Sequence, residues 1–281
     1  MRMVAAMSAA AVASKTYLIT GATDGIGKFT AQKLGRDGHR VLVHGRSKSK
    51  VDAVVKEIGE SGGVGHGFVA DLSVLAEVRR LGAEVAGEFP VIDGLLNNAG
   101  TFDGDYTGGR VVTADGNEYS LAVNVLAPFL LTSLLLDRVR ASPAGRILVT
   151  SSMSMGCGDA LDDLQCERRW SGHRAYSLSK LCCAMIAMEL HARYGDAPRL
   201  CVNTMDPGTV NTKMLLSGWG RCGIEVHEAT RSYHMLVDAD WGTKSGDCAA
   251  TSVDRECTDR SLRAKLWDDL VALTGAAYPE A

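Results

Sequence analysis

Apolar runs rich in β-forming residues alternate with segments of helical periodicity along most of this chain. The runs predict six strands, at residues 16–20, 40–45, 67–71, 92–100, 145–152 and 199–208. The segments between them predict helices at 26–37, 48–60, 74–88, 115–140 and 174–194. Because parallel strands joined by right-handed helical crossovers form a sheet covered on both faces, the pattern predicts an α/β fold with a doubly wound, Rossmann-type parallel sheet.

The composition is that of an ordinary soluble globular protein. Of the 281 residues, 46% are hydrophobic and 22% are charged, which argues against disorder. The length suits a single large α/β domain, predicted over residues 15–281 after an N-terminal tail at 1–14. The formal net charge of −3 gives no electrostatic footprint for nucleic acid.

The tail is rich in alanine and contains one arginine, Arg2. A frayed end is the preferred interpretation, and a weak targeting peptide is the alternative. No apolar run of about twenty residues stands out, so we expect no integral membrane segment. The eight cysteines include no C-x-x-C pair, so we expect reduced thiols in a cytoplasmic protein and no metal site.

The stretch TGATDGIGK places Gly21, Gly25 and Gly27 directly after the first predicted strand and at the start of a helix. Glycine permits positive φ and the close approach of another backbone or of a ligand. The first N–H groups of a helix are unpaired and lie at the positive end of its dipole, so such a turn favours phosphate. A glycine-rich turn without a ligand is the alternative.

The motif AYSLSK places Tyr176 and Lys180 four residues apart, so the two side chains share one face of the predicted helix. An ammonium beside a phenol favours the phenolate. Such a tyrosine can give a proton to a carbonyl oxygen, or take one from an alcohol, while a hydride moves to or from a nicotinamide. The alternative is an exposed helix pair without function.

Taken in order, TGATDGIG, NNAG, NVLAPF, RILVTSS, AYSLSK and DPGTVNT resemble the short-chain dehydrogenase/reductase family. DALDDLQCERRWSGHRAYSLSKLCCAM and the late KLWDDLVALTGAAY are similar to its retinol dehydrogenase and protochlorophyllide reductase-like branch. The resemblance covers roughly residues 15–280. Each motif is weak alone, whereas the ordered set is specific.

The resemblance implies a catalytic tetrad of Asn124, Ser152, Tyr176 and Lys180. Ser152 would hold the substrate oxygen against the Tyr176 phenol as an oxyanion-type donor, with Ser151 as the adjacent competitor. Lys180 would assist the phenol and bind the nicotinamide ribose. Asn124 would support a water chain that leads to Lys180.

The resemblance also implies a set of cofactor-binding residues. It comprises Gly21, Gly25, Ile26, Gly27, Asp71, Asn98, Tyr176, Lys180, Pro207, Gly208 and Thr212, to which the basic segment at the end of the second strand adds Arg46. The glycines would admit the pyrophosphate with Ile26 packed beneath it, and Asp71 would contact the adenine. Asn98 would lie beside the ribose, and the segment from Pro207 to Thr212 would cover the nicotinamide.

The second predicted strand ends in VHGRSKSK, which bears on the choice between NAD and NADP. No Asp or Glu occurs from Val41 to Val51, where an NAD-binding unit usually offers a carboxylate to the ribose. Arg46, Lys48 and Lys50 occur there instead. Cations favour a 2′-phosphate, so NADP is the expected cofactor, with a solvated basic loop as the alternative.

Apolar side chains after the last predicted strand indicate an apolar substrate pocket, a core or an oligomer interface. They are Met214, Leu215, Leu216, Trp219 and Met235. The final stretch predicts an amphipathic helix with Leu262, Leu266, Leu270 and Leu273 on one side.

The sequence therefore predicts an NADP-dependent oxidoreductase that interconverts a small carbonyl compound and an alcohol. It leaves open whether the protein forms a homo-oligomer. A non-catalytic NADP-binding regulator on the same fold is the first alternative. An epimerase or dehydratase on a related fold is the second, although only about 70 residues follow DPG in this chain.

Overall fold

The computed structural model describes residues 14–102, 108–249 and 252–280. Its centre is a seven-stranded sheet with the order β3-β2-β1-β4-β5-β6-β7, in which every pair is parallel. The strands are β1 (Thr16–Ile19), β2 (Arg40–Gly45), β3 (Val64–Val69), β4 (Gly94–Asn97), β5 (Gly145–Thr150), β6 (Leu200–Met205) and β7 (Cys248–Ala249). The strand order reverses between β1 and β4, and a crevice is expected at their carboxyl ends.

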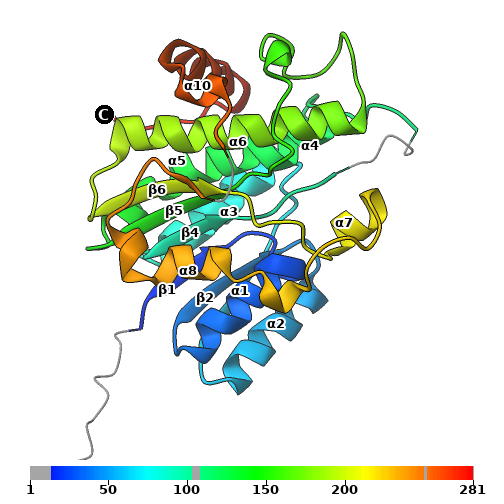
Figure 1. Ribbon diagram of the computed structural model, residues 1–281. Helices are drawn as coiled ribbons and strands as arrows, with labels where there is room; N and C mark the ends of the chain where they lie inside the picture. The colour runs from blue at the N-terminus through cyan, green and yellow to red at the C-terminus, as the bar shows by residue number, and fades with distance from the viewer. Residues whose placement is uncertain (1–13, 103–107, 250–251, 281) are drawn as a thin grey trace, which may run out of the picture.

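Helices cover both faces of this sheet (Figure 1). They are α1 (Gly25–Arg36), α2 (Lys48–Glu60), α3 (Leu75–Glu88), α4 (Tyr119–Leu121), α5 (Ala127–Arg140), α6 (Gly172–Tyr194), α7 (Lys213–Gly218), α8 (Arg231–Val237), α9 (Arg255–Thr258) and α10 (Arg260–Thr274). A π-helical turn, η1 (Ala122–Leu126), joins α4 to α5, and three 3-10 turns are η2 (Gly158–Ala160), η3 (Val226–Glu228) and η4 (Ala239–Gly242).

Two apolar cores lie against the two faces of the sheet. Helices α1, α2 and α8 cover one face, and α3, α5 and α6 cover the other, with α10 outside α6 (Figure 1). Successive strand residues enter opposite cores, so Tyr17 and Ile19 belong to one core while Leu18 belongs to the other. Burial on both faces explains why these strands are nearly continuous apolar runs.

The predicted α/β fold with a doubly wound parallel sheet is confirmed. Strand β7 was not predicted, because two residues carry no periodic pattern. The helix predicted near 115–140 begins at Tyr119 and contains the π-helical turn η1 between α4 and α5, neither of which was predicted. Pro128 has no N–H, so it cannot make the α-helical hydrogen bond to the carbonyl oxygen of Asn124.

The stretch Tyr119–Arg140 corrects the expectation that the chain lacks an apolar run of about twenty residues. By length and composition it could cross a membrane, with a mean hydropathy of 1.8 over 18 residues. In the structure 78% of that window is buried, and α5 packs against α3 and against strands β4 and β5. Core helices of globular domains have this same apolar character.

The predicted C-terminal helix is α10, but its buried face is offset from the predicted one. The buried residues are Arg263, Leu266, Trp267, Leu270 and Thr274, while Leu273 is 36% exposed. The large Trp267 indole packs on Phe129, with 4.9 Å between ring centroids, and this contact fixes the rotation of the helix. The N-terminal tail lies, apart from Ser14, outside the described residues.

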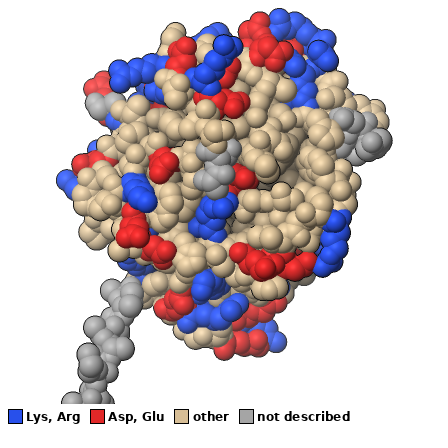
Figure 2. Space-filling model, viewed as in Figure 1, with Lys and Arg blue, Asp and Glu red and all other residues tan. Residues whose placement is uncertain are grey.

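Positive and negative side chains are mixed on one face of the molecule (Figure 2). On the face shown in Figure 2, the described Lys and Arg side chains are interspersed with Asp and Glu around a largely neutral centre. This mixture of signs agrees with the small net charge of −3.

Candidate active site

A pocket of about 660 Å³ lies at the carboxyl ends of the strands, where their order reverses. Most of the predicted site residues line it: Gly21, Gly25, Ile26, Arg46, Asp71, Asn98, Ser152, Tyr176, Lys180, Pro207, Gly208 and Thr212. Gly27 and Asn124 are buried just behind the wall. The fold therefore gathers residues from seven separate segments of the chain around one cavity.

Neighbouring protein atoms lie close to the glycines of the turn between β1 and α1. Gly21 and Gly25 have φ of +66° and +51°, which favour glycine. A Cβ on Gly27 would stand 2.4 Å from the Gly21 carbonyl oxygen and 2.6 Å from Nδ2 of Asn98. The interpretation that these glycines only make room for a ligand is therefore incomplete, since backbone conformation and internal contacts already require them.

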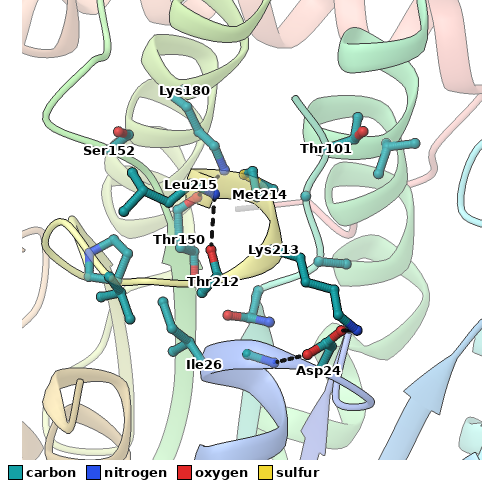
Figure 3. Close-up of a pocket in the computed structure, with 18 of the residues that line it drawn as sticks. Asp24, Ile26, Thr101, Thr150, Ser152, Lys180, Thr212, Lys213, Met214 and Leu215 are labelled. Atoms are coloured by element: carbon teal, nitrogen blue, oxygen red, sulfur yellow. Dashed lines mark hydrogen bonds and ion pairs between the residues drawn. The ribbon is translucent and has the colours of Figure 1, made fainter. Parts of the chain in front are cut away.

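Helix α7 closes over this turn (Figure 3). Asp24 caps α1 by accepting the Gly25 N–H at 2.9 Å, and its second carboxylate oxygen forms an ion pair with Lys213 of α7. Burial alone would raise the pKa of Asp24, but the Lys213 ammonium and the Gly25 N–H hold it below its usual range. Thr212 caps α7 by accepting the Leu215 N–H at 3.3 Å.

Arg46 is the basic residue of the VHGRSKSK segment that reaches the pocket. Its Nη1 donates to the hydroxyl oxygen of Tyr119 at 3.1 Å, and both side chains line the cavity. Lys48 instead forms an exposed ion pair with Asp52 at 2.7 Å. The carboxylate of Asp71 accepts the N–H and the hydroxyl of Ser73 at 2.9 and 2.8 Å, which fixes it at the pocket edge.

Tyr176 and Lys180 lie on neighbouring turns of α6, as their spacing predicted. Both are buried, with 8% and 3% exposed, and the Lys180 Nζ lies 5.6 Å from the centroid of the Tyr176 ring. The same Nζ donates to the Thr150 carbonyl at 3.0 Å. A Cβ on Gly100 would stand 3.3 Å from this Nζ, so the glycine of NNAG leaves the ammonium space.

The two adjacent serines after β5 have different surroundings. Ser151 is 1% exposed, and its hydroxyl donates to the Lys180 carbonyl at 2.7 Å. Ser152 is half-buried, and its Oγ accepts the Ser154 N–H at 3.1 Å, which leaves its own O–H available to the pocket. The geometry therefore favours Ser152 as the residue that can reach a ligand (Figure 3).

Asn124 sits in the π-helical turn, a feature often found at functional sites. Its Oδ1 accepts the Thr101 N–H at 2.8 Å, and its Nδ2 donates to the Thr101 carbonyl and to Ser179. Pro128 has no N–H to donate to the backbone carbonyl of Asn124. That carbonyl instead accepts a hydrogen bond from the Cys183 thiol at 3.0 Å. Burial raises the pKa of Cys183, so the thiol keeps its proton.

The segment between Ser152 and Tyr176 docks on the approach to α4. Gln165 accepts the Glu118 N–H and donates to the Asn117 side chain, both at 2.8 Å. Glu118 in turn accepts the Leu121 N–H at 2.7 Å and so caps α4. This segment therefore holds the short helix that carries Tyr119 at the pocket edge.

His44 at the end of β2 was not predicted to belong to the site. Its Nδ1 accepts the Gly21 N–H at 3.3 Å, so the proton must lie on Nε2, which donates to the Ala70 carbonyl at 3.1 Å. Burial lowers the pKa of His44 to about 4. A neutral imidazole therefore ties the glycine turn to the chain that follows β3.

The expected apolar residues after β6 are divided between two environments. Met214, Leu215 and Trp219 line the pocket. Leu216 is 44% exposed on the outer side of α7, and Met235 is buried in the core beneath α8. Met214, Leu215 and Trp219 therefore agree with the pocket interpretation and Met235 with the core interpretation, whereas Leu216 belongs to neither.

Three pocket residues carried no local sequence signal. His44 occupies a position in an apolar strand, Tyr119 precedes a long apolar helix, and Lys213 follows a threonine in a segment without regular periodicity. Each makes its contact with a residue at least 23 positions away in sequence. Only the folded chain brings such partners together.

Comparison with known proteins agrees with this geometry. A family model described as short chain dehydrogenase matches residues 15–218. The chain belongs to the short-chain dehydrogenase family. It is 33% identical to retinol dehydrogenase 14 of Homo sapiens, over 93% of this chain and 86% of that protein. It is 36% identical to polyprenol dehydrogenase of Mus musculus, over 93% of this chain and 84% of that protein.

Solved structures carry the same fold. A protein from Shigella flexneri solved in complex with NADP has a TM-score of 0.68 and 27% sequence identity, covering 83% of this chain and 95% of that one. The predicted family and its retinol dehydrogenase-like branch are therefore confirmed. The protein is an oxidoreductase of this family.

Proposed function

We propose that this protein is an NADP(H)-dependent oxidoreductase that interconverts an apolar carbonyl compound and its alcohol, with Tyr176 as the general acid and base. The observation that carries the proposal is that one pocket joins the glycine turn and Arg46 to Tyr176, Lys180 and Ser152. A dinucleotide site and a proton donor therefore share one cavity.

The residues present fit a bound dinucleotide. Gly25 and Ile26, the first residues of α1, line the pocket, and a helix N-terminus favours phosphate. The Thr150 hydroxyl oxygen is buried there with no hydrogen-bond partner in the described chain, and Lys180 uses one of its three donors on the Thr150 carbonyl. Arg46 supplies a cation suited to a 2′-phosphate. The NADP complex of the Shigella flexneri protein supports this choice.

When bound, NADPH supplies the hydride in carbonyl reduction. Ser152 donates its O–H to the carbonyl oxygen and holds that oxygen against Tyr176. The Tyr176 phenol transfers its proton to the oxygen as negative charge develops there, and the reverse transfer serves alcohol oxidation. Lys180, with its ammonium 5.6 Å from the phenol ring, favours the phenolate that remains.

In this proposal Asn124 is a positioning residue, which holds neighbouring segments of the site in place. Its side-chain amide holds the chain after β4 at Thr101 and the α6 residue Ser179, which precedes Lys180. The water chain that the family resemblance implied stays a prediction. The residues that line the substrate end, Met153, Leu215 and Trp219, favour an apolar substrate, as do the apolar alcohols named in the two relatives. A cytoplasmic location also stays a prediction.

The proposal is tested by NADPH oxidation with a panel of apolar aldehydes, ketones and quinones. Tyr176→Phe removes the transferable proton and keeps the ring, so turnover should fall by about 10²- to 10⁴-fold. NADPH affinity, measured by calorimetry, should change little. A Tyr176→Phe variant that keeps more than about half of the wild-type rate would remove Tyr176 from the mechanism.

The non-catalytic NADP-binding regulator predicts a different result in the same assay. NADPH would bind with normal affinity, but no member of the panel would be reduced, and Tyr176→Phe would change nothing. The presence of Ser152, Tyr176 and Lys180 around one cavity favours the enzyme.

A further inference from the structure

Phe102, the second residue after the NNAG motif, packs against the side chain of Tyr176. Each of the two side chains is 8% exposed, and their rings meet edge to face with 5.3 Å between centroids and an interplanar angle of 76°. Tyr176 lines the pocket, whereas Phe102 is not among the described residues that do. Phe102 therefore contacts the proposed proton donor from behind the pocket wall.

The end of α7 and the start of α6 confine the Phe102 ring. Trp219 stacks on it with 4.4 Å between centroids and an interplanar angle of 26°. A Cβ on Gly218 would stand only 2.6 Å from Cε1 of Phe102, so the backbone at the end of α7 lies close against the ring. His173, three residues before Tyr176 on α6, meets the same ring edge-on at 5.0 Å. These contacts hold Phe102 in one orientation.

The side-chain amide of Asn124 fixes the backbone beside both rings. Its Oδ1 accepts the Thr101 N–H at 2.8 Å, and its Nδ2 donates to the Thr101 carbonyl at 3.0 Å. The same Nδ2 donates to the Ser179 hydroxyl at 2.9 Å, and that hydroxyl donates to the Tyr176 carbonyl at 2.7 Å. With the backbone tied to one amide, the contact between Phe102 and Tyr176 limits the side-chain rotation that remains.

The orientation of the Tyr176 ring decides where its hydroxyl lies, because the hydroxyl is the atom farthest from the backbone. A proton donor must come within about 2.6 to 3.2 Å of the atom that it protonates. A displacement of about 1 Å can cost about 10²-fold in rate. Phe102 has no polar atom, so it can restrain the ring by a favoured edge-to-face contact without engaging the hydroxyl.

We propose that Phe102 is a positioning residue for Tyr176, whose ring it holds in the orientation from which the phenol transfers its proton. This inference rests on the proposed carbonyl–alcohol activity. It gives a role to a residue outside the tetrad that the family resemblance implied.

The kinetic test is a double-mutant cycle with the panel compound that the wild type reduces fastest. Phe102→Leu removes the ring and should lower kcat by about ten- to a hundredfold, while NADPH affinity measured by calorimetry stays within about twofold. In the Tyr176→Phe background, which lacks the transferable proton, adding Phe102→Leu should change the residual rate by less than about twofold. Phe102→Tyr keeps an aromatic ring and should keep most of the wild-type kcat.

Phe68→Leu is the matched control for a loss of stability. Phe68 is 5% exposed and meets Phe89 edge-on in the core, and it is not among the described residues that line the pocket. This variant should lower the free energy of unfolding and leave kcat unchanged. If Phe102→Leu does not fold, Phe102→Met replaces it, because methionine lacks a ring and fills irregular core space.

Fluorine NMR of the protein labelled with fluorotyrosine tests the ring itself, without turnover. The Tyr176 resonance is the one missing from Tyr176→Phe. Its line width should be the same in the wild type and in Phe68→Leu, and it should change in Phe102→Leu because the ring gains other orientations.

A Phe102→Leu variant that keeps more than about half of the wild-type kcat would overturn the inference. An equal loss in the Tyr176→Phe background, an equal loss in Phe102→Tyr, or an unchanged Tyr176 line width would also overturn it. Absence of all carbonyl turnover by the wild type would count against the proposed function, and the line widths would still show whether Phe102 holds the ring.

Discussion

Lys213 at the start of α7 forms an ion pair with Asp24, the residue that caps α1 on the other side of the pocket. The pair joins residues 189 positions apart and spans the glycine turn. Its side chains are 77% and 51% exposed, so solvent screens it strongly. An ion pair this exposed contributes at most about 1 kcal/mol, so it holds α7 against the start of α1 only weakly.

Removing this ion pair should speed cofactor release. An exposed ion pair contributes up to about 1 kcal/mol, so Lys213→Met should raise the NADPH dissociation rate by at most about fivefold in stopped-flow fluorescence. The difference should shrink in high salt. Lys265→Met breaks a comparable exposed pair with Asp269 on α10 and is the matched control. Equal rates for wild type and Lys213→Met would show that the pair does not retain α7.

Arg46 should determine the choice between NADPH and NADH. A hydrogen bond to a charged group contributes about 1.5 to 3 kcal/mol, which corresponds to a preference for NADPH of roughly ten- to a hundredfold. Arg46→Asp should reverse that preference, because the carboxylate repels a 2′-phosphate. Calorimetric titration of both cofactors is the measurement, and equal affinities in the wild type would contradict the assignment to NADP.

Tyr119 extends this prediction, since its hydroxyl accepts a hydrogen bond from Arg46 at 3.1 Å. Tyr119→Phe should lower NADPH affinity by about two- to tenfold and leave NADH affinity unchanged. Lys48→Ala is the control, because Lys48 pairs with Asp52 and does not line the pocket.

Substitution of the two serines after β5 should have different effects, one on kcat and the other on the free energy of unfolding. Ser152→Ala removes a donor to the substrate oxygen and should lower kcat by about 10²- to 10³-fold. Ser151→Ala removes the buried hydrogen bond to the Lys180 carbonyl and should mainly lower the free energy of unfolding, by about 1 kcal/mol. Steady-state kinetics and urea denaturation of both variants decide the assignment. A larger loss of kcat in Ser151→Ala would reverse it.

His44 should make the fold less stable in mild acid. Because its folded-state pKa is about 4 against an ordinary 6.5, the unfolded chain binds more protons between these values. The stability from the neutral imidazole is complete above about pH 6.5 and is lost as the pH falls toward 4, in total about 3 kcal/mol.

Urea denaturation at several pH values measures this effect. His44→Asn should flatten the dependence of the unfolding free energy on pH between about 4.5 and 6.5, since it removes the titrating group. The exposed His227→Asn is the control and should preserve the wild-type slope. An unchanged slope in His44→Asn would show that other groups cause the acid sensitivity.

Much of the fold was predictable because the pattern and the burial agree. The strand RVLVHG is apolar at the positions that the sheet covers on both faces, and helix α2 begins and ends where its periodicity does. The π-helical turn was not predicted, since Pro128 acts through a carbonyl four residues earlier within an otherwise regular apolar run. Strand β7 depends wholly on pairing with β6.

Within the site, residues in contiguous motifs were found and isolated ones were not. The four-residue spacing of Tyr176 and Lys180 predicted that they share one face of a helix, and α6 places them on neighbouring turns. Arg46 was found through its neighbours, but Tyr119, which orients it, lies 73 residues away. Sequence pattern captures residues that act through helical periodicity or a local turn, and it misses pairs that meet only through the sheet. The catalytic and cofactor roles of these residues stay predictions.

The packing around Gly21 and Gly27 has a consequence for how such turns evolve. A side chain at Gly27 would collide with the carbonyl oxygen of Gly21 and with Asn98, whether or not any nucleotide is present. A descendant that lost its ligand would therefore remain under selection to keep these glycines, simply to fold. In such a lineage the glycines would persist after the activity was lost. Thr150, whose hydroxyl has no hydrogen-bond partner among the described residues, and the pocket-lining Arg46 would be better markers of retained binding.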